Sequence, residues 1–373
     1  MLSGAGLDII SPKLKTLKGV SPKEMTTNSN LQALDDRSRG VLKSLIQIHI
    51  ATGEPVGSES VCGALHRSLS PATIRAIMAD LERAGYLDHP HTSAGRMPTD
   101  EGYRVYVDSL MSEQPLSPDD AAAIDQGLRA GAGAQVLEKA SHILSKLSRN
   151  IGFVLAPDVA QTSVMHIDLV RLPHPRILVV MVSRSGLVTH RVIEFEEPLT
   201  QDDLQTCTNY LNAHFTGMNL LTIRARLLDL MREEKALYDS LLKRVISVAD
   251  QAFAPEADGA SVYLDGTSNI VGRPEFDDIE KMRALFKTFE EKGRLVKIQN
   301  ECMHGEGIRI LIGHENSDPD LHGVAVVATG CPVGGESGWG LGVLGSTRME
   351  YPRIVSIVDH MARSIGRALT ETS

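Results

Sequence analysis

The stretch from Ser70 to Gly85 constrains the fold of this chain more than any other. Ser70-Pro71 is typical of a helix start, because a serine hydroxyl caps the first turn and the N–H that proline lacks would have no partner there. Gly85 is the expected end of the same helix. The large apolar side chains of the segment fall on one narrow stripe: Ile74, Ile77, Met78 and Leu81. We therefore predict a short amphipathic helix that packs through this stripe.

The opposite side of the predicted helix is built mainly from small residues. Ala72, Ala76 and Arg83 lie there, flanked by Thr73 and Arg75. Small side chains at the exposed N-terminal end would let a helix enter the DNA major groove deeply, because no bulk holds it away from the base edges. The helix is therefore a candidate for reading DNA.

Two further helices are predicted before it. Asp35-Asp36 begins the first, which has apolar residues at a period of 3.6 and ends at Gly53. Ser58 is expected to cap a short second helix, and a turn at 67–69 separates it from the third. Three helices with a short middle one and a tight turn indicate a helix-turn-helix, whose last helix is the reader.

The segment that follows has the composition of a β-hairpin. Tyr86-Leu87 begins an extended stretch, and residues 89–98 are too rich in turn residues for a helix. We expect a wing with Gly95-Arg96 at its tip, and a further helix from Thr99 or Asp100 to about Met111. The sequence thus predicts a winged helix-turn-helix domain over residues 31–112.

The candidate DNA contacts divide into three groups. Arg75 can bind guanine bidentately and the Thr73 methyl can pack on thymine, while Ser70 and Ala76 share the exposed end of the helix. Arg96 at the wing is expected to reach phosphate or the minor groove. Four other basic residues of the domain are candidates for phosphate contacts, which position the protein on the duplex without reading the base sequence: Arg37, Arg39, Lys43 and Arg67.

Each candidate has a plainer interpretation. Ser70 can serve as a helix cap alone, Arg75 can form an ion pair within the domain, and Arg96 can be a solvated loop residue. Charge also argues against DNA binding, because the net charge of the chain is −9 and residues 31–112 contain 8 Lys and Arg against 10 Asp and Glu. Phosphate attraction depends on local rather than total charge, so the DNA hypothesis rests on shape and motif.

The remaining two thirds of the chain predict an α+β domain with a helical insertion. Residues 1–30 have the composition of a mobile tail, and 113–133 that of a linker with some helical content. Strands and helices over 134–199 and 256–373 indicate one domain, interrupted by a mainly helical segment at 200–255. Apolar residues at a/d spacing between Leu137 and Ile151 could form a dimer contact or be buried within their own domain.

No convincing catalytic or metal-binding constellation is present in the sequence. The four cysteines are scattered, His89-Pro-His91 and Cys302-Met-His304 lack metal-ligand spacing, and Gly340–Gly345 matches G-x-G-x-x-G without the strand and helix that such a site needs. No apolar run is long enough to span a membrane, and no secretory signal is apparent. We expect a cytoplasmic, non-enzymatic protein without a cofactor.

Several motifs together resemble the heat-inducible transcription repressor family of the HrcA type. The likeness covers roughly residues 31–370. The motifs that carry it are Glu54-Pro-Val-Gly-Ser58, Leu69-Ser-Pro-Ala-Thr-Ile-Arg75, Met78-Ala-Asp-Leu-Glu82, Gly85-Tyr-Leu87, His91-Thr-Ser-Ala-Gly-Arg-Met-Pro-Thr99, Gly102-Tyr-Arg-Val-Tyr-Val-Asp108 and Gly342-Val-Leu-Gly-Ser-Thr-Arg-Met-Glu-Tyr-Pro352.

The resemblance implies a fold and a mode of action. The fold would be a winged helix-turn-helix followed by a GAF-like α/β domain that carries an inserted dimerisation domain. The function would be that of a homodimer that represses chaperone operons at an inverted-repeat operator in double-stranded DNA. The GroEL chaperonin would maintain the repressor in its active form, and heat stress would abolish repression. Ala76 departs from the family, in which many members have Asn there, and Gly345-Ser346 stands where relatives tend to have Gly-Pro.

Two alternatives to this mechanism stay open at the level of sequence. A small ligand bound in the GAF-like domain could control the repressor, which an apolar pocket with a few convergent polar groups would favour. The glycine-rich C-terminal region could instead belong to an enzyme, although only weak motif matches support that.

Overall fold

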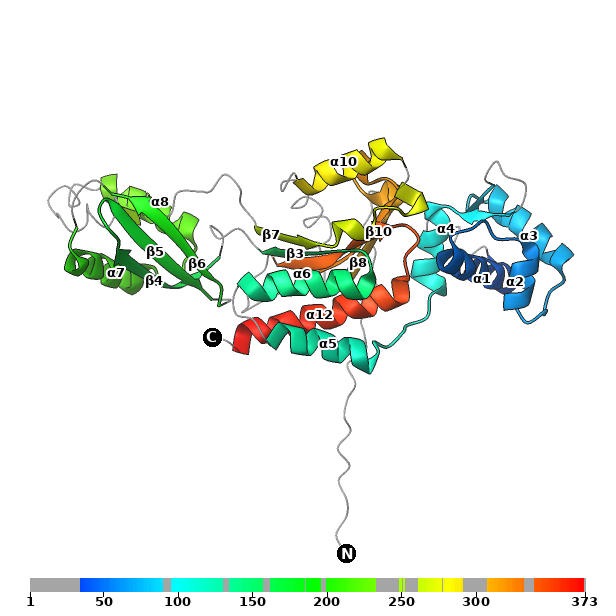
Figure 1. Cartoon of the computed structure of the whole chain (residues 1–373), viewed down its shortest axis with the longest axis horizontal. Coiled ribbons are helices and arrows are strands. Elements are labelled where there is room, and N and C mark those ends of the chain that lie inside the picture. The colour runs from blue at the N-terminus through cyan, green and yellow to red at the C-terminus, as the bar shows by residue number, and fades with distance from the viewer. Residues whose placement is uncertain are drawn as a thin grey trace, which may run out of the picture.

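The fold is described by a computed structural model of the chain. The residues that it describes are 34–89, 95–129, 134–156, 162–184, 186–195, 199–232, 248–249, 251, 261–276, 278–290, 307–331 and 339–371. Predictions for the N-terminal tail and for His91 and Cys302 lie outside the described residues. The described elements form an α+β fold with three parts along its length (Figure 1).

The N-terminal part, residues 34–111, begins with three helices and a two-stranded hairpin. The helices are α1 (Asp36–Thr52), α2 (Ser58–Ala64) and α3 (Pro71–Arg83). Strands β1 (Leu87–Asp88) and β2 (Met97–Pro98) pair antiparallel. Helix α4 (Asp100–Val105) follows and continues as a π-helical turn, Tyr106–Leu110. We call this part the N-terminal unit.

The boundaries of these helices follow from their caps. Asp35 caps α1 by accepting a hydrogen bond from the Ser38 N–H at 2.8 Å, and Gly53 ends it in the left-handed conformation at φ 78°. The expected cap of α2 is corrected by one residue, because Gly57 is the N-cap while Ser58 is the first helical residue and is buried. Thr99 is the N-cap of α4, so this helix begins at Asp100, one of its two predicted starts.

A five-stranded antiparallel sheet forms the centre of the chain. Its strands are β3 (Ile151–Ala156), β7 (Ser261–Asp265), β8 (Ile308–Ile312), β9 (Val324–Gly330) and β10 (Gly340–Ser346), in the spatial order β7-β3-β10-β9-β8. Short 3₁₀ turns lie at Thr267–Asn269, Pro274–Phe276, Gly313–Glu315 and Pro319–Leu321. Both faces of the sheet are covered, so β3, β9 and β10 are buried along almost their whole length.

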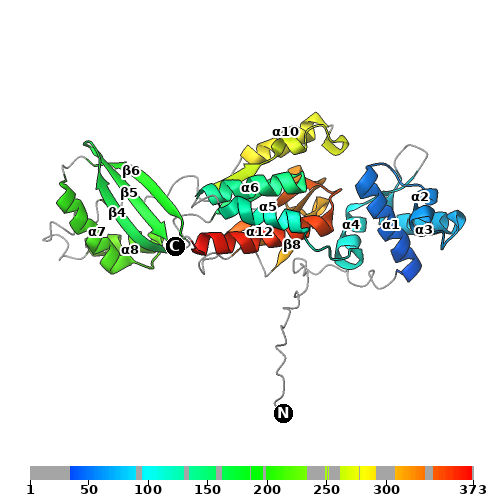
Figure 2. The same ribbon diagram turned by 60° about the horizontal axis from the view of Figure 1, so that its bottom comes forward.

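Helices α5 (Pro118–Arg129), α6 (Ala134–Ser148) and α12 (Tyr351–Glu371) cover one face, and α10 (Ile279–Glu290) lies on the other side of the sheet (Figures 1 and 2). Helix α5 corrects the expected linker at 113–133, because Ile124 and Leu128 are buried against α6 and α12. Leu137, Ala140, Leu144 and Ile151 of the next stripe are buried within the subunit, which favours the second of the two interpretations left open for it, burial within its own domain, over a dimer contact.

A second, three-stranded sheet forms the third part. It contains β4 (Val164–Arg171), β5 (Arg176–Ser183) and β6 (Val188–Glu194), packed against α7 (Gln201–Phe215) and α8 (Leu220–Arg232). The sequence predicts that these strands share a domain with β3. Their separate sheet and separate apolar core correct that assignment, because they pack with the helices at 200–255 instead.

None of the helices in the described ranges is long and apolar enough to cross a lipid bilayer.

Candidate nucleic-acid interface

Helix α3 begins as its sequence predicts. Ser70 adopts an extended conformation at the N-cap, and its Oγ accepts a hydrogen bond from the Thr73 N–H at 3.2 Å. The Oγ atoms of the two residues are also 2.9 Å apart. Pro71 occupies the first turn without losing a hydrogen bond. The cap therefore fixes the start of the helix and holds the Thr73 side chain.

The two faces of α3 differ as predicted. Ile74, Met78 and Leu81 are buried, with exposed fractions of 0%, 4% and 1%. Thr73, Arg75 and Ala76 are exposed. The apolar stripe thus anchors α3 against α1 and α2 and leaves the face with small residues open to solvent within the subunit.

Arg75 has only a weak contact within the subunit. Its Nη2 lies 3.5 Å from Ser58 Oγ, at the limit of a hydrogen bond. No ion pair of Arg75 is present among the described residues, so the alternative interpretation of an intradomain ion pair finds no support. The guanidinium can be recruited by a ligand at little cost.

The turn between α2 and α3 places one more basic residue at the surface. His66 and Arg67 both adopt positive φ, 49° and 59°, which non-glycine residues rarely do. The Arg67 N–H donates to the Cys62 carbonyl at 2.9 Å, and Cys62 Sγ lies 3.4 Å from the Leu69 carbonyl oxygen. The turn is therefore closed by its own hydrogen bonds, and the Arg67 side chain is exposed.

The position expected for Arg96 requires a correction. Arg96 does not lie at the tip of the hairpin, because it directly precedes β2 and its backbone pairs with Val56 in both directions, at 2.9 and 3.0 Å. Its Nε donates to Glu82 Oε2 at 2.6 Å, and Nη1 lies 2.9 Å from His89 Nδ1. The side chain is 25% exposed and connects the base of the hairpin to α3.

The remaining candidates lie on α1 and differ in availability. Arg37 is exposed, whereas Arg39 and Lys43 are half-buried. Lys43 Nζ donates to Ser112 Oγ at 3.0 Å, and Arg39 has a partner of its own. The structure thus brings Ser70, Thr73, Arg75 and Ala76 together on one face and leaves these three basic residues on another helix.

Two arginines that were not among the predicted site residues join the N-terminal unit to the central part, which comprises the five-stranded sheet with α5, α6, α10 and α12. Arg104 on α4 pairs with Glu315, and Arg348, in the loop before α12, donates to the carbonyl of Ile50 at 3.2 Å. Both lie inside the motifs that carry the family resemblance, which was the one available signal.

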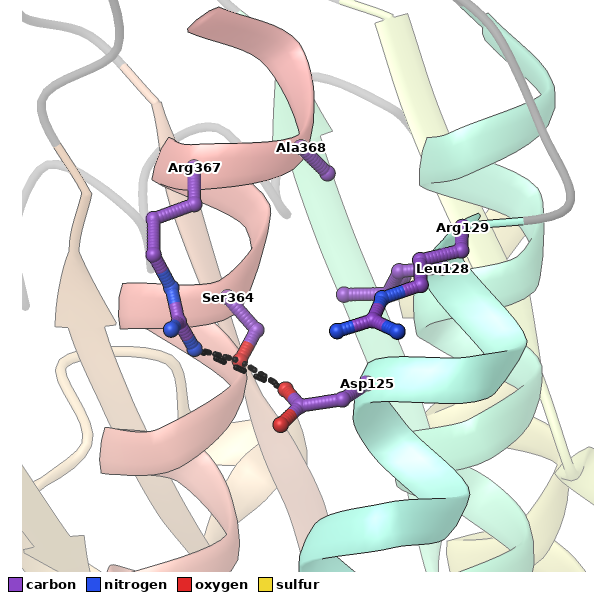
Figure 3. Close-up of a pocket in the computed structure, with 6 residues that line it drawn as sticks. All are labelled: Asp125, Leu128, Arg129, Ser364, Arg367 and Ala368. Carbon is purple, nitrogen blue, oxygen red and sulfur yellow. Dashed lines mark hydrogen bonds and ion pairs between the residues drawn. The ribbon is translucent and has the colours of Figure 1, made fainter. Parts of the chain in front are cut away.

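A small cavity lies between α5 and α12 (Figure 3). Its volume is about 90 Å³, and Asp125 Oδ1 accepts a hydrogen bond from Ser364 Oγ at 2.7 Å. That hydrogen bond lowers the pKa of the Asp125 carboxyl. Pockets for drug-sized ligands are mostly apolar and measure roughly 300–1,000 Å³, so this cavity does not favour control by such a ligand. Its lining residues are Asp125, Leu128, Arg129, Ser364, Arg367 and Ala368.

Comparisons with known proteins define what kind of protein this is. Residues 134–355 match the family described as HrcA protein C terminal domain. Heat-inducible transcription repressor HrcA of Geobacter sulfurreducens is 40% identical over 341 residues, which cover 90% of this chain and 98% of that protein. The repressor of the same name from Syntrophobacter fumaroxidans is 34% identical over 341 residues, covering 91% and 98%.

These relatives place the chain in the class of transcription repressors, which are regulators and not enzymes. The chain belongs to the HrcA family of heat-inducible transcription repressors, as its motifs indicated. The assignment overturns the alternative of an enzyme that uses the glycine-rich C-terminal region.

One solved structure supports the fold. The crystal structure of a hypothetical protein at 2.2 Å resolution matches with a TM-score of 0.62 and 22% sequence identity, covering 91% of this chain and 100% of that one. At this identity the match bears on the α+β fold alone.

Proposed function

We propose that the N-terminal unit is a winged helix-turn-helix that binds double-stranded DNA through α3. The observation that carries the proposal is the division of α3 into a buried stripe, represented by Ile74 and Met78, and an exposed face at its N-terminal end. A helix with that division can enter a major groove about 12 Å wide while its other side stays packed.

Arg75 and Thr73 are the proposed base contacts. The Arg75 guanidinium is free to bind guanine O6 and N7, and the exposed Thr73 methyl can pack on thymine. Ser70 acts first as a cap, and Ala76 lets the helix approach closely. Proposed phosphate contacts come from Arg67 in the turn before α3 and from three basic residues of α1: Arg37, Arg39 and Lys43.

For Arg96 we propose a positioning role in place of direct contact. Its bonds to Glu82 and to the backbone of Val56 hold the base of the hairpin beside α3. The hairpin can then lie along the DNA next to the groove that α3 enters.

We further propose that the repressor is a homodimer that binds an inverted-repeat operator upstream of chaperone operons in the cytoplasm. The three-stranded sheet supports a dimer, because one face packs on α7 and α8 while the other exposes apolar side chains. Val170, Val188 and Val192 on that face are 37%, 53% and 49% exposed. We assign the dimerising insertion to residues 162–251 and the GAF-like domain to the parts on either side of it.

The control proposed for the repressor is maintenance by a GroEL-type chaperonin. A partner that favours the DNA-competent fold raises its population, and competition from heat-damaged proteins for that partner lowers it. Adding chaperonin and ATP to the purified repressor should increase operator affinity in a gel-shift assay. Unchanged affinity would refute this mode of control while leaving DNA binding intact.

The DNA proposal is tested by fluorescence anisotropy with a labelled duplex from the upstream region of the chain's own gene. Arg75→Ala should weaken binding by about 1–3 kcal/mol. Arg363→Ala is the matched control, because Arg363 is an exposed arginine on α12, outside the N-terminal unit, and pairs with Asp359 on its own helix. Equal binding by the wild type and the Arg75 variant would refute base contact by Arg75.

A further inference from the structure

Arg348 caps a helix of the N-terminal unit from outside that unit. Its Nη1 donates to the carbonyl of Ile50 in the last turn of α1, where carbonyl groups have no partner within the helix. A cation is also favoured at this end by the helix dipole. Gly53 makes room for the contact, since a Cβ there would lie 2.9 Å from Arg348 Nη1.

Glu275 holds Arg348 in this position. The Arg348 guanidinium pairs with the Glu275 carboxylate through Nε, and the two side chains are 20% and 26% exposed. Burial alone would raise the pKa of Glu275, but the hydrogen bond and the charge of Arg348 lower it. The carboxylate is therefore charged and fixes the direction of the guanidinium.

Arg104 makes a second connection between the two parts, this time from the N-terminal unit to the central part. This residue of α4 donates from Nε to Glu315 Oε1 at 2.6 Å and from Nη2 to the Ile310 carbonyl at 2.6 Å. Ile310 belongs to β8, which forms an edge of the five-stranded sheet. Arg104 is 19% exposed, and such charge-assisted bonds of a planar guanidinium restrict orientation strongly.

An aromatic pair lies at the same junction. The rings of Tyr103 and Tyr351 have centroids 6.1 Å apart and an interplanar angle of 53°. Both residues are buried, with exposed fractions of 2% and 0%. Apolar burial is not directional, whereas hydrogen bonds are. The tyrosines therefore hold the two parts together, and the arginines determine their orientation.

We infer that Arg104 and Arg348 are positioning residues for operator binding, which they support without contacting DNA. By fixing the orientation of the N-terminal unit on the central part, they hold the two α3 helices of a dimer at one separation. The inference rests on the proposed function, in which a dimer binds two half-sites.

Loosening this junction should affect two-site binding specifically. When both units are held in register, the second half-site is bound at a high effective concentration. If the units reorient freely, the competent fraction falls and the apparent dissociation constant rises in proportion. Binding of one unit to one half-site depends only on the surface of α3 and should not change.

The test compares full-length variants on two duplexes from the chain's own upstream region, one with both half-sites and one with a single half-site. By anisotropy, Arg104→Ala and Arg348→Ala should each bind the first about tenfold more weakly and the second within about twofold of the wild type. Arg348→Lys keeps the charge at α1 and should recover part of the loss. Arg353→Ala is the matched control, because it removes the Arg353–Asp120 pair, whose atoms are 3.2 Å apart, inside the central part.

Each outcome decides the inference. A selective loss on the two-site duplex, absent from Arg353→Ala, supports it. Unchanged binding would overturn the inference, because the arginines would then have no role in it. An equal loss of affinity on both duplexes, or the same loss in Arg353→Ala, would also overturn it, because either result indicates general destabilisation. A wild-type chain that binds neither duplex would refute the proposed function, and the inference with it. Thermal melting of each variant verifies that it is folded.

Discussion

Arg96 Nε lies 2.6 Å from Glu82 Oε2, so an arginine of the hairpin is paired with the helix that we propose reads DNA. Both side chains are about one third exposed or less, at 25% and 32%. The pair links β2 to the C-terminal half of α3 and leaves the N-terminal end of that helix free. It therefore places the hairpin beside the helix.

Removing this ion pair should destabilise the N-terminal unit modestly. Arg96→Ala should lower the free energy of unfolding by about 1 kcal/mol, because the pair is partly buried and hydrogen-bonded. Urea denaturation of Arg96→Ala, Glu82→Ala and the double variant measures the coupling between them. Purely additive losses would show that the two residues do not interact. Arg83→Ala, which breaks a more exposed pair, should have a smaller effect.

Loss of the Ser70 cap of α3 should lower the free energy of unfolding, although the Ser70 side chain is exposed. Ser70→Ala leaves the Thr73 N–H without its acceptor and should cost about 1 kcal/mol. Ser68→Ala, two residues earlier in the turn, is the control and should be nearly neutral. If both variants have the same unfolding midpoint in urea, the cap does not stabilise the helix.

Two glycines of the N-terminal unit should respond to alanine in opposite ways. A Cβ on Gly95 would lie 2.7 Å from the backbone carbonyl carbon of Pro55, so Gly95→Ala should destabilise by about 1–3 kcal/mol. Gly63 lies within α2 with no atom within 4 Å of a Cβ, so Gly63→Ala should stabilise by up to about 1 kcal/mol. Differential scanning calorimetry measures the change in melting temperature of each variant, which should be negative for Gly95→Ala and positive for Gly63→Ala. Equal shifts would contradict the close approach at Gly95.

His49 should make stability depend on pH. Burial lowers the pKa of His49 below 6.5, and the positive charge of Arg348 lowers it further. The hydrogen bond with the Glu54 carbonyl and the negative charge of Glu275 raise this pKa, but their effect is smaller. The unfolded state then binds more protons than the folded state near this pH. Stability is therefore full above about 6.5 and falls as the pH decreases below it.

Urea unfolding at pH 7.5 and 5.5 measures this dependence. His49→Gln should reduce the difference between the two pH values. An unaltered pH dependence in His49→Gln would show that another group is responsible.

The local features of the fold could be predicted from sequence, because they depend on neighbouring residues. The cap at Ser70 and the stripe from Ile74 to Leu81 are set within one helix, and Asp35 and Gly53 mark the ends of α1. Contacts between distant segments left no such signal. Strand β10 went unpredicted because Gly340, Gly342 and Gly345 are poor strand formers.

The reason for one of those glycines appears only in the folded sheet. A Cβ on Gly342 would lie 2.5 Å from the Val327 carbonyl oxygen of the neighbouring strand. Helix α5 was similarly judged a linker because its burial depends on packing against α6 and α12. For the candidate site, sequence identified the exposed residues of α3 but not the partner of Arg96, since no local rule relates Arg96 to Glu82.

The central claim, that α3 binds operator DNA, is tested most directly by footprinting the purified chain on the upstream region of its own gene. We predict two symmetric protected stretches whose centres are separated by whole helical turns of about 10 base pairs. Arg75→Ala should lose this protection at concentrations that saturate the wild type. Absence of protection by the wild type at low salt, or identical protection by the Arg75 variant, would contradict the account.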